Sequence, residues 1–213
     1  MKIQLLTDNP KSWIIPYVHK LKEDLKLRYP SYRVLLVDDH EKVKEGDVLC
    51  LLACEKVFKK LKLNTYNLVV HESNLPKGKG WSPVTWQVLE GKSKIPVTLF
   101  EATDKVDSGK IYLQDFIILK GDELLTEIKH QQGIITNKLI LEFIKKYPSI
   151  TGREQFGEES FYKRRTAKDS ELDIRSSIDK QFNLLRICDN ERYPAFFYKN
   201  DVKYILKIFK ENE

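Results

Sequence analysis

The chain has 213 residues, of which 41% are hydrophobic and 32% charged, and its formal net charge is +6. This composition predicts a globular protein that can bury a core, and it excludes a disordered or fibrous chain. The apolar runs, such as 48–53, are far shorter than the roughly 20 residues that span a bilayer, and no signal-peptide pattern is found, so we expect a cytoplasmic protein without a membrane partner.

Lys and Arg alternate with Asp and Glu along almost the whole chain, so no basic arm is available to grip a nucleic-acid backbone. A modestly basic surface suits a small phosphorylated or nucleotide substrate instead. Cys50, Cys54 and Cys188 lack the paired spacing of a zinc site or a redox motif. They are predicted to be buried free thiols, and no metal is implied.

The first half of the chain alternates strands with helices. Strands are predicted at 2–7, 33–37 and 48–53, and at the apolar run 68–70 that leads into His71. Helices are predicted from a cap at Ser12 to Tyr29, where Pro30 follows, and as a short basic segment at 55–63. This order predicts an α/β, Rossmann-like fold with a mostly parallel central sheet covered on both faces.

Two common nucleotide-binding motifs are missing. No Gly-x-Gly-x-x-Gly follows the first predicted strand, and no Walker-type loop is present in the sequence. A dinucleotide or ATP site in the usual place is therefore not expected.

The second half predicts a helix at 82–90, strands at 96–102 and 110–120 around a polar turn at 104–109, and a long helix at 122–147. Residues 1–148 would form the main domain and 149–160 a linker. Residues 161–213 would form a small carboxyl-terminal α+β appendage, with a helix at 176–188 and a hairpin turned at 199–201. We expect 163–165 to form a solvated basic face and the exposed aromatic hairpin to support a homodimer.

His71 and Asp107 carry the functional signal jointly. Ligands collect at the carboxyl ends of strands in open α/β sheets, where His71 lies, yet a single such histidine is more often a packed or capping side chain. Asp107, before Ser-Gly, taken alone is a turn residue. The spacing of the two motifs around them is what favours a catalytic pair.

His71-x-Ser73-x-Leu75-Pro76, followed by Asp107-x-Gly109-x-Ile111, resembles the folate-dependent formyltransferases. The segment 98–107 is similar to the family's strand before its catalytic aspartate. The segments 165–173 and 193–197 resemble the region after the catalytic domain in tRNA and sugar formyltransferases, so the likeness extends over 47–120 and 161–206. The resemblance implies a formyltransferase fold.

The resemblance also assigns roles. Formyl transfer needs an oxyanion to be stabilised and an attacking amine to lose a proton, and a histidine beside a carboxylate can serve both needs. His71 and Asp107 would be that pair. The family usually has an asparagine two residues before the histidine, where this chain has Val69. As substitutes for its amide, Asn74 and Ser73 on the following loop rank above Asn67, which lies further back along the strand.

The formyl donor implied by the resemblance is 10-formyltetrahydrofolate, used as a cosubstrate without a metal. In the family its pterin ring lies between the loop after the third strand and the loop before the catalytic aspartate. The corresponding positions fall within 52–57 and 102–106, and the predicted contacts are Leu52, Ala53, Cys54, Glu55, Lys56, Ala102, Thr103, Asp104 and Val106.

Lys77, Lys79 and Trp81 combine two cations with an indole beside His71, which suits contact with a phosphate and stacking on a base or sugar. A solvated basic loop explains the same residues. The chain is too short after 160 for the barrel of the tRNA enzymes, so the resemblance favours N-formylation of a nucleotide-linked amino sugar for a surface glycan. Alternative acceptors are glycinamide ribonucleotide and aminoacyl-tRNA, and Val69 leaves open a non-catalytic folate or nucleotide-binding module.

Overall fold

The computed structural model describes residues 1–211 and is built around a six-stranded sheet in the order β2-β1-β3-β4-β6-β7. The bounds of these strands are β1 Lys2–Leu6, β2 Arg33–Val37, β3 Gly46–Leu51, β4 Asn64–His71, β6 Lys94–Glu101 and β7 Ile111–Ile118. The strands β2, β1, β3 and β4 are parallel, whereas β6 runs antiparallel to β4 and β7 antiparallel to β6. The predicted mixed α/β fold with a mostly parallel sheet is confirmed.

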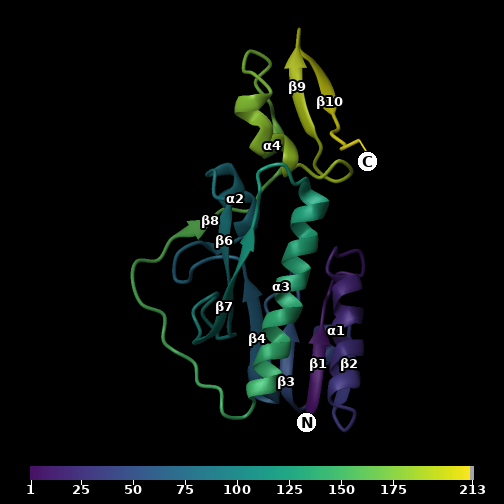
Figure 1. Ribbon diagram of the computed structural model, residues 1–213, viewed down its shortest axis with the longest axis vertical. Coiled ribbons are helices and arrows are strands. Elements are labelled where there is room, and N and C mark those ends of the chain that lie inside the picture. The colour runs from purple at the N-terminus through teal and green to yellow at the C-terminus, as the bar shows by residue number, and fades with distance from the viewer. Residues whose placement is uncertain (212–213) are drawn as a thin grey trace.

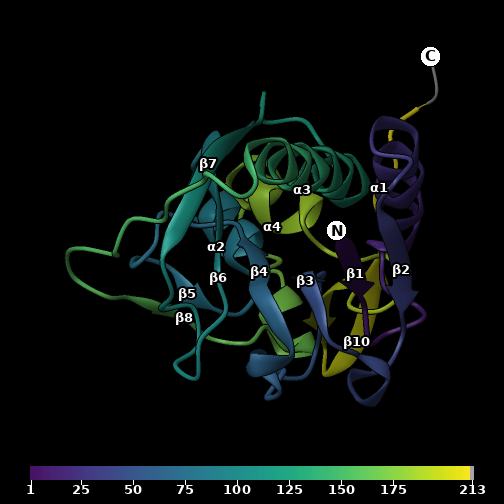
Figure 2. The same cartoon turned by 90° about the horizontal axis from the view of Figure 1, so that it is seen from below.

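Two long helices lie side by side on one face of this sheet, α1 Ile15–Arg28 and α3 Leu125–Lys146 (Figures 1 and 2). Their apolar stripes bury Leu21 of α1 and Phe143 of α3 in the main core together with the central strands. Gly133 lets the helices approach closely, because a Cβ there would lie 2.4 Å from the ring of Tyr17. The helix α1 begins after Ile14 without a side-chain cap, so Ser12 was wrongly predicted as the cap.

The opposite face of the sheet lacks the predicted basic helix at 55–63. Only a single 3₁₀ turn, Leu61–Leu63, forms there. Phe58 instead inserts its ring into an apolar cluster with Leu49 and Val37, which an irregular backbone permits. A helix this short gains few hydrogen bonds for the entropy it loses, so burial of one aromatic ring outweighs helix propensity.

The helix predicted at 176–188 is also much shorter than expected, since only a 3₁₀ turn at Asp179–Gln181 and the helix α4 Phe182–Arg186 are present. The Gln181 amide donates to the carbonyl oxygens of Asp173 and Ser176, which competes with helical pairing. The predicted hairpin is confirmed as β9 Ala195–Lys199 and β10 Val202–Leu206, turned at 200–201, where both residues have positive φ.

Residues 149–160 return from the end of α3 to the region of the helix α2 Pro83–Leu89 (Figure 1). We call this segment the strap. It pairs with the start of β7 through two backbone hydrogen bonds between Arg153 and Ile111, and it leads into the strand β8 Phe161–Tyr162, which pairs with β5 Lys79–Gly80. Within residues 1–211, no helix is both long enough and apolar enough to span a bilayer.

Candidate active site

A cavity of about 640 Å³ opens at the carboxyl ends of β3 and β4. Its walls come from the loop after β3, the start of α2, the loop after β6, one face of α3 and the appendage. His71 and Asp107 both line it. A larger hollow of about 830 Å³ lies between α3 and the appendage, but it contains neither residue, and charges there such as Lys210 and Glu127 pair with each other.

His71 is buried at the last position of β4, and its Nε2 lies 2.8 Å from the carbonyl oxygen of Gly78 and 3.9 Å from Oδ2 of Asp107. A carbonyl oxygen can only accept, so Nε2 carries the proton in this arrangement. The distance to Asp107 exceeds a hydrogen bond but is within reach of one bridging water or a small rotation of the imidazole. The structure therefore brings the two predicted catalytic side chains together.

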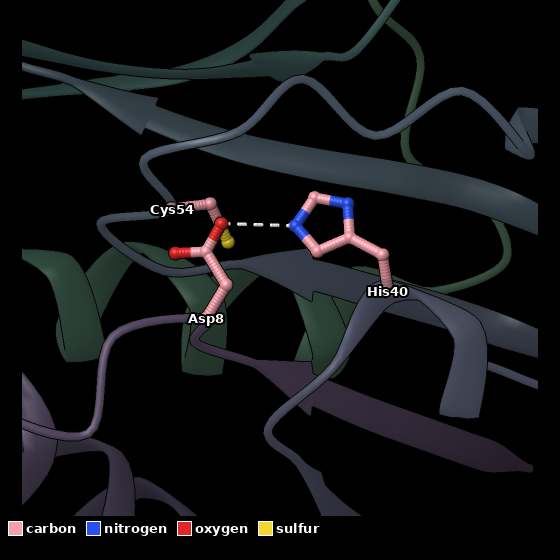
Figure 3. Close-up of side chains that lie close together, drawn as sticks. All are labelled: Asp8, His40 and Cys54. Atoms are coloured by element: carbon pink, nitrogen blue, oxygen red, sulfur yellow. Dashed lines mark hydrogen bonds and ion pairs between the residues drawn. The ribbon is translucent and has the colours of Figure 1, made fainter.

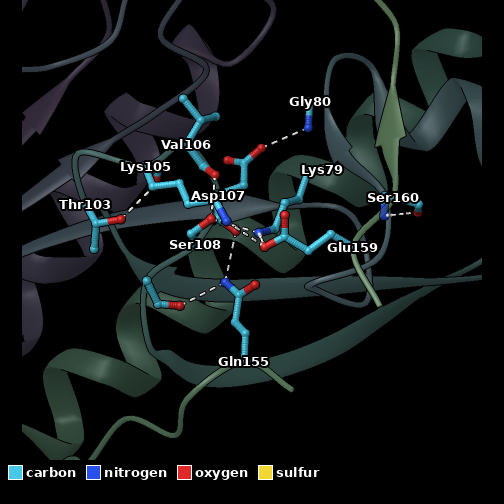
Figure 4. Close-up of polar contacts among 12 residues, drawn as sticks. Lys79, Gly80, Thr103, Lys105, Val106, Asp107, Ser108, Gln155, Glu159 and Ser160 are labelled. Carbon is cyan, nitrogen blue, oxygen red and sulfur yellow. Dashed lines mark hydrogen bonds and ion pairs between the residues drawn. The ribbon is translucent and has the colours of Figure 1, made fainter. Parts of the chain in front are cut away.

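Asp107 sits in a braced loop (Figure 4). Its Oδ2 accepts from the backbone N–H of Gly80 at 2.9 Å, and its backbone has φ of +51°, a left-handed conformation that costs energy for a residue other than glycine. Gly109 two positions later is required, because a Cβ there would lie 1.8 Å from the carbonyl oxygen of Glu101. The loop holds the carboxylate in one place beside His71.

The strap supplies most of this bracing. The side-chain amide of Gln155 donates to the carbonyl oxygens of Asp107 and Gly109, at 3.0 and 2.9 Å. The ammonium of Lys79 donates to Ser108 Oγ and forms an ion pair with Glu159 at 2.8 Å (Figure 4). Sequence reasoning missed Gln155 and Glu159, because a polar segment without periodicity gives no sign that it folds back on the site.

Lys79 was expected to contact the acceptor, but it is only 1% exposed, its ammonium is paired, and it does not line the cavity. Lys77 is exposed and also lies outside the cavity. Trp81 does line it and remains 43% exposed. The structure thus retains Trp81 alone from the predicted acceptor contacts and gives Lys79 a bracing role.

The predicted substitutes for the missing asparagine, Asn74, Ser73 and Asn67, all lie outside the cavity lining. Asn74 is exposed and accepts from Gln114, Ser73 is buried with no partner for its hydroxyl among residues 1–211, and Asn67 donates to the carbonyl oxygen of Leu61. Val69 itself lines the cavity and packs beside Phe100. The placement of Asn74 and Ser73 removes the geometric basis for ranking them first.

The two predicted folate loops face each other across one end of the cavity. Eight of the nine predicted positions line it, namely Leu52, Ala53, Cys54, Glu55, Lys56, Ala102, Thr103 and Val106. Asp104 is exposed and lies outside. The slot between these loops is mostly apolar, which suits a flat ring system held by backbone groups.

The first loop is tied down by Asp8, His40 and Cys54, which the fold gathers from three segments (Figure 3). The Asp8 carboxylate accepts from the backbone N–H groups of Glu55 and Lys56 and lies 3.0 Å from His40 Nε2. Burial alone would raise the pKa of Asp8, but these hydrogen bonds lower it overall. Burial raises the pKa of the Cys54 thiol to about 12.

Basic side chains of the appendage also contribute to the cavity wall. Arg164, Arg165 and Arg192 line the cavity, and the guanidinium of Arg164 lies 4.7 Å from the centre of the Trp81 ring. The sequence predicted 163–165 as a solvated face, and Lys163 and Arg164 are indeed exposed, whereas Arg165 is partly buried. What the sequence did not predict is that Arg164 and Arg165 also line the cavity, because the parallel pairing of β5 with β8 is a long-range contact.

Comparison with known proteins agrees with this geometry. The model of the formyl transferase family matches residues 34–141. The chain belongs to this family. The bifunctional polymyxin resistance protein ArnA of Wigglesworthia glossinidia brevipalpis is 30% identical over 93% of this chain, which spans 28% of ArnA. Two methionyl-tRNA formyltransferases, from Kosmotoga olearia and Thermodesulfovibrio yellowstonii, are each 29% identical to this chain. The matched part of this chain spans 44% and 39% of their lengths.

Solved structures share the fold. A methionyl-tRNA formyltransferase from Clostridium thermocellum superimposes with a TM-score of 0.79 at 21% identity, covering 100% of this chain and 94% of that one. A sugar N-formyltransferase from a Shewanella species gives 0.73 at 13% identity, covering 100% and 99%. HypX from Aquifex aeolicus, in complex with tetrahydrofolic acid, gives 0.77 at 15% identity over 98% of this chain and 37% of HypX.

Proposed function

We propose that this protein transfers a formyl group from 10-formyltetrahydrofolate to the amine of a nucleotide-linked amino sugar. The observation that carries the proposal is the position of His71 and Asp107, 3.9 Å apart in the wall of one cavity. The two folate loops and the arginines of the appendage line this same cavity. Donor and acceptor would therefore meet at the catalytic pair.

The chemistry assigns a task to each side chain. The amine attacks the formyl carbon, and the Nε2–H of His71, which points to the carbonyl oxygen of Gly78 in this structure, would turn to donate a hydrogen bond to the oxyanion that develops. The bond from the formyl carbon to the folate nitrogen then breaks, and that nitrogen takes up a proton that the former amine releases. Asp107 fixes the imidazole and stabilises its positive charge while the proton passes. Val69 supplies no donor, so His71 bears the oxyanion stabilisation that an amide would share.

The donor proposal rests on the apolar slot between the loops 52–57 and 102–106 and on the fold shared with HypX, which was solved with tetrahydrofolic acid. The acceptor proposal rests on Trp81, whose exposed ring can stack on a base or sugar, and on three arginines that suit a diphosphate. A role in surface glycan synthesis follows from such an acceptor. We place the reaction in the cytoplasm, since all three cysteines are free thiols.

Incubation with 10-formyltetrahydrofolate and a panel of nucleotide-linked amino sugars, followed by mass spectrometry, tests the proposal. The panel also contains glycinamide ribonucleotide and methionyl-tRNA, because a methionyl-tRNA formyltransferase shares the fold. We expect one formyl group to be added to a sugar acceptor only. Formylation of tRNA or the ribonucleotide alone would reject the acceptor class.

A second candidate function is a folate-binding module without transferase activity. It is favoured by the apolar side chain of Val69 at the position where the family has an amide donor. Tight binding of tetrahydrofolate together with no product from any acceptor in the panel would select this candidate.

A further inference from the structure

Glu72 is a buried carboxyl group in the cavity wall that the roles above do not use. It follows His71 directly, lines the same cavity and is 9% exposed. Gln132 of α3 donates to its Oε1 at 2.7 Å, and Gln87 of α2 donates to its backbone carbonyl at 2.6 Å. The helix α3 therefore holds the carboxyl group and α2 holds the backbone of Glu72, one residue along the chain from the catalytic histidine.

The Glu72 carboxylate lacks a cationic partner in the part of the chain that the structure describes. Lys129, the nearest cation along α3, is paired with Asp189 at 3.2 Å. A carboxylate can accept about four hydrogen bonds, and one is supplied here, by Gln132. Burying an unpaired charge is costly. A ligand with a positively charged hydrogen-bond donor would therefore supply the partner that the Glu72 carboxylate lacks.

The neighbouring charged groups also favour Glu72 as the partner of a ligand cation. Asp107 cannot fill this role freely, since its Oδ2 already accepts from Gly80 and faces His71. Burial raises the pKa of Glu72, and the negative charge of Asp107 adds to this, whereas His71 opposes it. A raised pKa makes a carboxylate a stronger proton acceptor than an ordinary glutamate.

We infer that Glu72 is the site that binds the acceptor's ammonium group and removes its first proton, an inference that rests on the proposed function. One N–H bond of the ammonium breaks and its proton passes to Glu72, which leaves a lone pair on nitrogen. That lone pair forms the new bond to the formyl carbon. The second nitrogen proton is lost after attack and reaches the departing folate nitrogen by way of His71, and Glu72 returns its proton to water.

The substitution Glu72→Gln preserves size and still accepts a hydrogen bond from Gln132, but it removes the charge. With the acceptor identified by the panel, calorimetry compares its binding with that of the analogue carrying hydroxyl in place of the amine. We expect the wild-type protein to prefer the amine by about tenfold to hundredfold, as for a charged hydrogen bond. The variant should lose this preference, and its rate should recover only at higher pH, where the amine is already neutral.

Glu142→Gln is the matched control, because it makes the same chemical change on α3 at an exposed carboxylate paired with Lys146. It should retain the amine preference and the wild-type pH profile. Glu72→Asp keeps the charge and should retain part of the preference. If Glu72→Gln kept the full preference and the wild-type pH profile, the inference would be overturned while the proposed function stood.

A measurement on the wild-type protein needs no acceptor. Infrared spectroscopy detects the carbonyl band of the protonated Glu72 side chain, which is identified by its loss in Glu72→Gln. The band is followed through a pH titration in methylammonium chloride and, separately, in an equal concentration of sodium chloride. We expect methylammonium to lower the pH at which the band disappears. If methylammonium lowers this pH but the panel gives no formylated acceptor, Glu72 still binds amines and the proposed function is rejected. If the band disappears at the same pH in both salts, the amine site is rejected.

Discussion

Val69 and His71 lie two positions apart on β4, and both line the cavity. The cavity wall therefore changes along this strand from an apolar side chain to the proposed catalytic histidine. Neither the amides of Asn67 and Asn74 nor the hydroxyl of Ser73 replaces the family's asparagine in the lining. His71 is consequently the side chain at the end of this strand that can donate to a developing oxyanion.

We therefore predict that His71→Ala lowers the rate of formyl transfer by at least about 10²-fold, the lower range for a positioned acid or base, while the protein stays folded. Asp107→Asn should lower the rate as well, since an amide cannot stabilise the imidazolium. Steady-state kinetics measure the rates and circular dichroism checks the fold. Unchanged turnover in His71→Ala would reject the assignment.

At the scale of elements, the loop after β3 depends on Asp8, whose carboxylate accepts two backbone N–H groups of that loop. Asp8→Asn should lower the free energy of unfolding by about 1–3 kcal/mol at neutral pH, since these are hydrogen bonds to a charged group. Because the pKa of Asp8 is lowered in the folded state, its contribution is full above the ordinary value of 3.8 and is lost as the pH falls further.

Urea unfolding of the wild-type protein and Asp8→Asn tests this prediction. The difference in stability should shrink as the pH falls below the ordinary aspartate pKa of 3.8. A difference that grew as the pH fell below this value would contradict the assigned direction of the pKa shift. Weaker binding of tetrahydrofolate by the variant is also expected, because Glu55 and Lys56 line the predicted folate slot.

The strap is the second element whose alteration is predicted to change the activity of the protein. Gln155→Ala leaves the carbonyl oxygens of Asp107 and Gly109 without their donor. We expect the turnover number to fall about tenfold, corresponding to about 1.4 kcal/mol, because Asp107 is less well positioned, with tetrahydrofolate binding unchanged.

Glu154→Ala is the control for this change, since it removes a neighbouring side chain whose ion pair with Lys110 is exposed and worth little. It should keep wild-type turnover and stability. Equal losses in the two variants would show that the strap acts through general stability and does not position the catalytic loop.

At the scale of the whole molecule, the hairpin of β9 and β10 projects from the end opposite the amino terminus (Figure 1). Its exposed apolar side chains are Tyr198, Val202, Tyr204, Ile205 and Leu206, between 37% and 61% exposed. Among the described residues, the outer edge of β10 has no strand paired with it, and such an edge pairs readily with an identical strand. We propose a homodimer formed by two such hairpins around a two-fold axis.

The double substitution Tyr204→Ser with Ile205→Lys should convert this dimer to a monomer, because it removes apolar area and places two like charges across the symmetric interface. Light scattering coupled to size exclusion gives the mass. A wild-type monomer over the accessible concentration range would reject the proposed interface. The active-site cavity contains neither residue, so formyl transfer should persist in the monomer.

Periodicity and turn residues predicted the strands of the sheet, the two long helices and the hairpin, because each of these follows a local pattern. The helix predicted at 55–63 was wrong and the one at 176–188 was too long, since burial of Phe58 and side-chain hydrogen bonds of Gln181 outweigh local propensity. The division of the chain at 148 and 160 stays a prediction. The strap nevertheless contacts the main domain through Arg153 and Gln155.

The sequence by itself determined the family resemblance, the pairing of His71 with Asp107 and the two loops of the predicted folate slot, since these lie in continuous motifs at strand ends. Only the tertiary structure decided that Lys79 is a brace, that the arginines of the appendage line the cavity and that Glu72 lacks a cation. Each of these depends on segments distant in sequence that the sheet and α3 bring together, and such contacts leave no periodic pattern along the chain.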